Sequence, residues 1–455
     1  MSSQTNTHQH LAMKIIILAT FIIFLQTLKI SAQCPAPTIN ETSKTIASKT
    51  FEIKNNSPSN EMILTFKGSV ENASWAIKDS EGATVTLFTD GVYNQDVILF
   101  GGSEKFLYRA MLGKFAVGKH IVTVVLNELQ SAKNTRHAKM SDLNVSPIVV
   151  NTTEDKIAVT NAPILYLRPD TIDKFSDIPL ITYYEIIRSN DNSFKIRYTT
   201  IFTNEDGGTQ TTALMARWGR ATDIEWVYEL EITNGVPTSE IIQGVNHITK
   251  NFVGARMFGN HPVIFDAADN NNFADTGCSA LRIALPPTRM DLSDKSRETV
   301  MDTNAWTYRI MAQEAFREGR VDPNNLGENT IDDLRNYLYV EIYSEPNSAA
   351  VAIESESING KISRSDFNDA KLRITRGGYQ RIAVRFPDAV STLKSLKLVC
   401  EPVNGTQVTG ICQSSRIIKF LKLDTAYKPL ETVNPDIKSN YIKTGEKLIW
   451  FLKVR

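Results

Sequence analysis

Two carboxylates and two histidines have the clearest capacity for chemistry in this chain. Asp223 and Glu225 stand two residues apart in a segment of alternating apolar and polar residues, and His247 and His261 follow downstream. Side chains two residues apart on a strand point to the same side of the sheet. Two such carboxylates can hold a cation or serve as general acid and base. The candidate catalytic residues are therefore Asp223, Glu225, His247 and His261.

In a simpler interpretation, these carboxylates take part in no reaction. Arg217 and Arg220 precede the strand and can neutralise Asp223 and Glu225, or the acidic face of the strand can be solvated. A glycosidase pair usually takes its two acids from different strands. The spacing alone therefore leaves a hydrolase and a structural acidic face both open.

Ligand binding is the third interpretation of the same segment. Trp218 lies between Arg217 and Arg220, just before Asp223. Aromatic faces stack on sugars, while a few polar groups fix the hydroxyls. The predicted ligand-binding residues are Arg217, Trp218, Arg220, Asp223 and Glu225, and the predicted ligand is a glycan or another surface ligand.

An oxygen-rich run follows, from Asp266 to Gly277. Calcium prefers carboxylate and amide oxygens, so the run predicts a calcium site. It has no EF-hand spacing, and Asp and Asn also make ordinary turns. The predicted metal ligands are Asp266, Asp269, Asn271 and Asp275.

Motifs of several common enzyme classes do not occur. The sequence contains no H-E-x-x-H, no G-x-S-x-G, no phosphate-cradling glycine loop and no C-x-x-C. These absences weigh against the usual zinc hydrolases, serine hydrolases, nucleotide-binding enzymes and thiol oxidoreductases.

The elements that must position these residues are mainly strands. Segment 223–232 predicts a strand with Ile224, Trp226, Tyr228 and Leu230 on its packing face and an acidic opposite face. Segment 194–202 predicts a second strand, with Phe194, Ile196, Tyr198 and Thr200 on one face. Segment 306–318 predicts a helix that ends at Gly319.

Short β-rich runs with turn signals precede and follow this region, which indicates a mainly β, multidomain protein. β-Sandwich-like modules are expected to flank a central β-rich domain with one or two helices. The predicted domains are a β-sandwich at 33–150, a central domain at 151–290, a helical linker at 291–335 and a β-rich module at 336–455.

The N-terminus predicts export. Residues 15–28 are apolar but too short and interrupted for a comfortable membrane span, and Ala32 is a small residue suited to signal-peptidase cleavage. Residues 1–32 are thus a predicted signal peptide, and no membrane span is expected after its removal. The protein is expected to be secreted, periplasmic or at the cell surface.

The four cysteines are consistent with an exported protein, in which disulfides can form. Cys400 and Cys412 flank a segment containing Asn404-Gly405, and we predict a disulfide across a hairpin. Cys34 and Cys278 can pair, or Cys34 can carry a lipid.

The net charge weighs against one large class of partner. Lys plus Arg and Asp plus Glu each number 50, so the formal net charge is zero. Nucleic-acid-binding domains normally carry a basic excess, so nucleic acid is not expected as a partner.

Residues 163–285 resemble the vacuolar protein sorting 62-like family. In that family a "D-x-E" strand is followed by a His-Pro strand, and here Asp223-Ile224-Glu225 is followed by His261-Pro262. The chain departs from the family's Gly-Asp-Trp-Glu, because it reads Thr222-Asp223-Ile224-Glu225. The resemblance implies a β-rich fold and brings no reaction with it.

Taken together, these patterns favour an exported protein that binds a ligand or carbohydrate, and calcium is the expected metal. A hydrolase in the central domain and a structural or adhesion protein are the alternatives.

Overall fold

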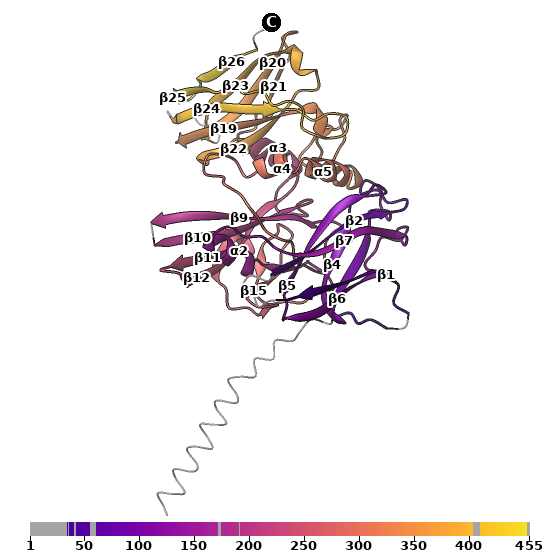
Figure 1. Cartoon of the computed structure of the whole chain (residues 1–455). Coiled ribbons are helices and arrows are strands. Elements are labelled where there is room, and N and C mark those ends of the chain that lie inside the picture. Colours follow the sequence, from indigo (N-terminus) through magenta and orange to yellow (C-terminus); the bar gives the residue numbers. More distant parts are fainter. Residues whose placement is uncertain are drawn as a thin grey trace, which may run out of the picture. The chain divides into compact units, whose positions relative to one another are not determined.

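The computed structural model describes residues 34, 36–40, 42–54, 61–171, 174–190, 192–403 and 410–452 (Figure 1). The chain separates into two compact units, Met1–Ala36 and Pro37–Arg455. The predicted signal peptide lies outside the described residues. Within them, no helix is long and apolar enough to cross a membrane. The predicted fold class is confirmed, since the protein is mainly β with several separate sheets.

Two antiparallel sheets form the N-terminal sandwich. Leu64 and Phe66 of one sheet share a core with Val85, Leu87 and other residues of the second. Residues 74–78 form one of the β-rich runs for which the sequence predicts a strand. That prediction is wrong, because Ser74 and Ser80 close a turn there through a 2.7 Å backbone hydrogen bond. The first sheet has the order β1 (Thr45–Ile53), β6 (Gly118–Asn127), β3 (Ala83–Thr89), β4 (Val92–Leu99), and the second has β5 (Phe106–Lys114), β2 (Glu61–Val70), β7 (Ala138–Pro147).

The central sheet has eleven strands and mixes parallel with antiparallel pairing. Its long antiparallel part comprises β9 (Pro179–Asn190), β10 (Ser193–Phe202), β11 (Ile224–Thr233) and β12 (Val236–Gly244). Strand β8 (Ile164–Tyr166) pairs in parallel with β15 (His261–Asp266). The remaining short strands are β13 (Ile248–Asn251), β14 (Arg256–Met257), β16 (Phe273–Ala274), β17 (Arg282–Ile283) and β18 (Thr288–Arg289).

Four α-helices accompany the sheets in the described part of the chain. The predicted helix at 306–318 is confirmed as α5 (Trp306–Arg317), and Gly319 follows it in the left-handed conformation, with φ of 69°. Helix α2 (Thr153–Thr160) begins where the Thr152 side chain accepts a 3.0 Å hydrogen bond from the backbone of Asp155. The others are α3 (Thr211–Trp218) and α4 (Thr299–Thr303).

A second sandwich forms the C-terminal part, and its two sheets share one apolar core. One sheet has the order β22 (Gly378–Arg385), β19 (Tyr337–Asn347), β24 (Ile411–Leu421), β25 (Ile437–Lys443). The other has β21 (Ile362–Arg364), β20 (Ala349–Ser357), β23 (Leu393–Pro402), β26 (Lys447–Phe451). Short 3-10 segments lie at Val245–His247, Leu334–Asn336, Ala370–Leu372 and Val390–Thr392.

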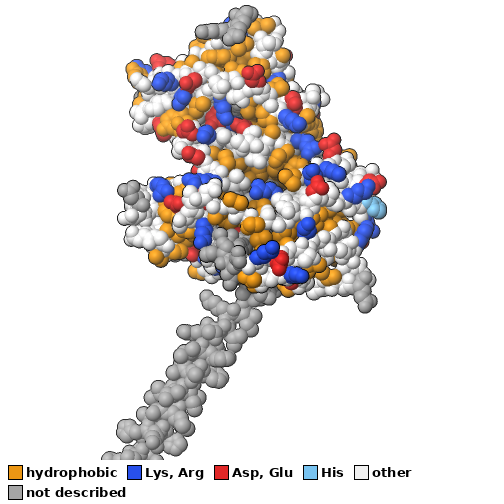
Figure 2. Space-filling model, viewed as in Figure 1, with side chains coloured by type: hydrophobic (Ala, Val, Ile, Leu, Met, Phe, Trp, Pro, Cys, Tyr) orange, Lys and Arg blue, Asp and Glu red, His pale blue; other side chains and the backbone are white. Residues whose placement is uncertain are grey.

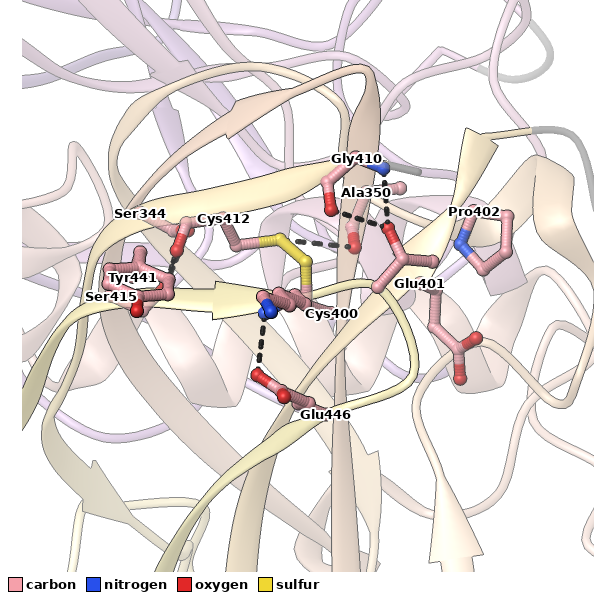
Figure 3. Close-up of a disulfide and its surroundings, with 12 residues drawn as sticks. Ser344, Ala350, Cys400, Glu401, Pro402, Gly410, Cys412, Ser415, Tyr441 and Glu446 are labelled. Atoms are coloured by element: carbon pink, nitrogen blue, oxygen red, sulfur yellow. Dashed lines mark hydrogen bonds between the residues drawn. A yellow bond between two sulfur atoms is a disulfide. The ribbon is translucent and has the colours of Figure 1, made fainter. Parts of the chain in front are cut away.

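The predicted Cys400–Cys412 disulfide is present, with Cα atoms 5.9 Å apart (Figure 3). Its setting differs from the prediction, because β23 and β24 belong to opposite sheets and do not form a hairpin. The expected Asn404-Gly405 turn lies outside the described residues. Cys34 and Cys278 are also disulfide-bonded. Disulfides fit a protein of an oxidising compartment.

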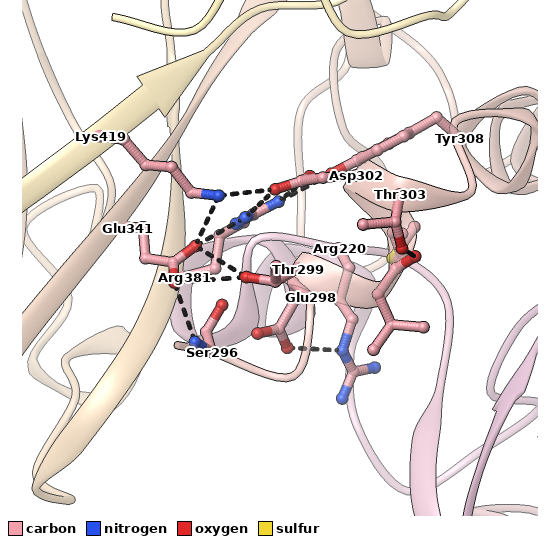
Figure 4. Close-up of polar contacts among 12 residues, drawn as sticks. Arg220, Ser296, Glu298, Thr299, Asp302, Thr303, Tyr308, Glu341, Arg381 and Lys419 are labelled. Carbon is pink, nitrogen blue, oxygen red and sulfur yellow. Dashed lines mark hydrogen bonds and ion pairs between the residues drawn. The ribbon is translucent and has the colours of Figure 1, made fainter. Parts of the chain in front are cut away.

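A buried ionic network joins α4 to the C-terminal sandwich (Figure 4). Arg381 on β22 donates to Asp302 on α4 at 2.6 and 2.7 Å, and to Glu341 on β19 at 2.7 Å. Lys419 on β24 adds a 2.9 Å bond to Asp302. Burial alone would raise the pKa of Asp302, but the charge and hydrogen bonds of Arg381 lower it to about 2.

Charged side chains of both signs are interspersed over the face of the molecule seen in Figure 2. No large patch of a single charge is visible on that face, in keeping with the balanced composition.

Candidate functional site

A β-bulge decides where the two strand carboxylates point. Tyr198 on β10 faces Tyr228 on β11, but the next residue, Thr199, faces Trp226, so Val227 is extra. A bulge reverses the alternation of side chains beyond it. Asp223 and Glu225 therefore share a face with Tyr228, whereas Glu229 lies on the opposite one.

The predicted single acidic face thus does not exist. Glu229 pairs with Lys195 at 3.0 Å and with Arg197 at 2.6 Å, on the side where Trp226 lies half-buried. Asp223 is only 2% exposed and has other partners. It accepts hydrogen bonds from the backbone of Ile224 at 2.8 Å and from the side chain of Asn271 at 3.0 Å.

Four more carboxylates gather around this pair. Asn271 donates from the same nitrogen to Asp223 and, at 3.2 Å, to Asp177. Arg168 pairs with Asp177 at 3.2 Å and also with Asp206. Together with Glu205 and Asp266 they form a buried group, which we call the carboxylate centre: Asp177, Glu205, Asp206, Asp223, Glu225 and Asp266.

Burial and mutual repulsion disturb the acidity of this centre. Burial, reinforced by the charge of Asp223, raises the pKa of Glu205 to about 8 and that of Glu225 to about 7. Burial likewise raises the pKa of Asp266 to about 8, against the charge of Arg168. The pKa of Asp177 is raised well above its usual range by burial and by the charges of Asp206 and Asp266.

His247 lies at the edge of the centre and His261 does not. The Nε2 of Gln243 is 2.6 Å from Glu225 Oε2 and 2.6 Å from Nδ1 of the exposed His247, so this amide connects the two side chains. His261 is fully buried elsewhere, 2.9 Å from the carbonyl oxygen of Ala162 and 3.1 Å from Glu61. The structure therefore brings three of the four candidate catalytic residues together.

The residues predicted to hold calcium are dispersed. Asp266 is buried at the end of β15, Asp269 is exposed in the following loop, and Asp275 accepts a 2.9 Å bond from the backbone of Val253. Across the described ranges, no group of three or more His, Cys, Asp and Glu side chains is arranged to hold a metal ion. Of the predicted set, Asp266 and Asn271 belong to the carboxylate centre or contact it.

Most side chains of the predicted aromatic and arginine surface are buried or contact other residues of the protein. Arg220 is 2% exposed and pairs with Glu298 at 3.1 Å. The guanidinium carbons of Arg217 and Arg376 lie 4.5 and 4.7 Å from the ring centre of Trp218. Tyr228 is fully buried. A sugar could not stack on Tyr228, and Trp218 already has two cationic neighbours.

An asparagine anchors the centre, which gives a testable expectation. Replacing Asn271 by Ala removes the shared donor of Asp177 and Asp223, and should lower the free energy of unfolding by about 1–3 kcal/mol. Denaturant titration at pH 7 measures this loss. The neighbouring Asn270→Ala change should cost less than about 0.5 kcal/mol. Equal losses in both variants would show that Asn271 does not organise the carboxylates.

No sequence pattern predicts the aromatic-lined cleft that lies elsewhere in the protein. It has a volume of 380 Å³ and lies among β4, β5, β9, the segment 283–288 and the start of α5. Trp306 stacks on Phe100 with ring centres 5.3 Å apart and meets the edge of Phe106 at 5.1 Å. We call it the aromatic cleft; Leu107, Arg109, Leu285 and Asn304 are among its other lining residues. Its residues come from five segments of the chain, so no local motif marks them.

An acidic recess adjoins the carboxylate centre. It has a volume of 410 Å³ and is lined by Arg168, Asp170, Asp206, Ala268 and Asp269. Asp206 belongs to the carboxylate centre, so the recess gives solvent a route to that centre.

Comparisons with known proteins add little. No family model matches the chain, and no curated protein matches it. A solved structure described as "EclA C-terminal domain; sugar-binding protein" matches with 17% identity, over 26% of this chain and 81% of that chain, at a TM-score of 0.18. A TM-score this low carries no argument about fold or ligand.

Proposed function

We propose that this chain is an exported ligand-binding protein that holds a small carbohydrate in the aromatic cleft. The observation that carries the proposal is the cleft itself, whose 380 Å³ lies within the usual range for ligand pockets. Sugars present an apolar C–H face and a hydroxyl rim. An aromatic wall with a few polar groups is complementary to both.

The lining of the cleft fits that class of ligand. Trp306 is partly exposed, and its contacts with Phe100 and Phe106 fix its orientation, so little side-chain entropy is lost on stacking. Arg109 is exposed, and Asn304 is partly buried on the lining. Both supply donors for hydroxyl groups.

A glycan array tests the proposal. Wild-type protein is expected to bind a defined group of glycans. Trp306→Leu should weaken binding at least about fivefold, because a central aromatic contact typically contributes more than about 1 kcal/mol. Trp226→Leu is the matched control, since Trp226 lies on the central sheet and does not line the cleft. Binding that survives Trp306→Leu unchanged would place the ligand elsewhere, and an array without binding would remove carbohydrate as the ligand class.

A hydrolase is the second candidate. It is favoured by the near-neutral pKa of Glu225, about 7, and by the link through Gln243 to His247. Against it, neither Asp223 nor Glu225 lines the aromatic cleft or the acidic recess. We also propose that residues 163–285 are related to the vacuolar protein sorting 62-like family.

A further inference from the structure

The carboxylate centre carries more negative charge than its surroundings balance. Its six carboxyl groups face three guanidinium groups, those of Arg168, Arg220 and Arg297. Arg220 and Arg297 also serve the buried Glu298. Buried charge must be neutralised, by bound protons or by a counter-ion.

Two buried side chains of this region have oxygen atoms without hydrogen-bond partners of good geometry. Asp266 is 6% exposed. The backbone N–H of Ala268 lies near its carboxylate, but neither oxygen accepts a hydrogen bond of good geometry. Asn271 is fully buried, and its Oδ1 is also without a partner, although its Nδ2 holds Asp177 and Asp223. Orphaned buried oxygens are costly, and a cation would satisfy them.

The donor set indicates the kind of cation. It consists of carboxylate and amide oxygens without sulfur, which favours hard cations such as calcium. The acidic recess above Asp206 gives such an ion an entry path lined by Asp170 and Asp269.

We propose that the carboxylate centre binds one calcium ion beneath the acidic recess, with Asp266, Asp177 and the amide oxygen of Asn271 as ligands. This set has only two carboxylates, so it is compatible with the lack of a preformed group of three acidic, histidine or cysteine ligands in the described ranges. Calcium accepts amide oxygens, backbone carbonyls and water in its remaining positions. The inference is independent of the proposed carbohydrate cleft.

Thermal unfolding at pH 8 tests the site, with chelator, with 2 mM free CaCl₂ or with 2 mM free MgCl₂. Ligand that binds only the folded state raises the melting temperature. Calcium is expected to raise it by several degrees and magnesium by less. The calcium shift should disappear in Asp266→Asn, which keeps the shape of the side chain, and remain in the control Asp275→Asn.

Equilibrium dialysis with radioactive calcium gives the stoichiometry directly. Wild type and Asp275→Asn should each bind one ion per chain, and Asp266→Asn at least tenfold more weakly. If Asp266→Asn does not fold, Asp177→Asn takes its place in both assays. Absence of calcium binding by wild type, or equal binding by the ligand variant, would overturn the proposal and leave protons as the neutralising species.

Discussion

In the presence of chelator, the free energy of unfolding should fall steeply as the pH rises from 5 to 8. Three carboxyl groups of the carboxylate centre cause this fall: Glu205 and Asp266, each with a pKa of about 8, and Glu225, with a pKa of about 7. Each group contributes about 1.4 kcal/mol per pH unit while it holds a proton only in the folded state. A total loss of several kcal/mol is expected.

The direction follows from proton linkage. In the unfolded chain these carboxyls lose their protons near pH 4, whereas in the folded protein they retain them up to pH 7–8. Between those limits the folded state binds more protons, so raising the pH favours unfolding. The stabilisation is fully present below about pH 4 and is gone above about pH 8.

Guanidinium chloride titrations at pH 5, 6, 7 and 8 measure this slope. The Glu205→Gln and Glu225→Gln variants should each flatten it, because the amide cannot ionise. The exposed Glu104→Gln is the control and should leave it unchanged. A stability that is level or rising across this interval would show that the carboxyls are ionised in the folded protein.

Replacing Arg381 by Met should destabilise the protein by about 3–5 kcal/mol. Arg381 is 1% exposed and is bound by Asp302 and Glu341, so its loss leaves two buried carboxylates without their main partner. Lys419 retains contacts with both and limits the loss. The effect should appear in the denaturant midpoint at pH 7.

Arg416→Met is the matched control for that change. Arg416 lies on β24 and pairs with Asp436 at the surface, 2.5 Å apart, where an ion pair contributes about 0–1 kcal/mol. Similar losses in both arginine variants would mean that the buried network does not hold α4 to the sandwich.

The sequence predicts the β-rich architecture well because it is a matter of local periodicity. Runs such as 120–126 are rich in β-branched residues and follow a turn signal at Gly118, and β6 covers this run. The strand predicted at Trp75 fails for a tertiary reason. The β-like composition there serves a turn whose tryptophan is fully buried and donates to Glu314 at 2.9 Å.

Only part of the candidate site can be predicted from the local spacing of residues. Asp223 and Glu225 are identifiable from their spacing, and Val227 is an exception to the alternation of the segment. One apolar residue on a polar face does not by itself predict the bulge that separates the pair from Glu229. Asp177 and Asp206 belong to other segments and meet the pair only through Asn271 and Arg168. Long-range contacts of this kind leave no trace in local spacing.

Fluorine NMR of protein labelled with 5-fluorotryptophan tests the proposed function most directly. The chain has five tryptophans, and Trp→Phe variants assign their resonances. Addition of a glycan selected from the array should shift the Trp306 resonance in a saturable way and leave that of Trp226 unchanged. Saturable binding without a shift at Trp306 would contradict a ligand site in the aromatic cleft.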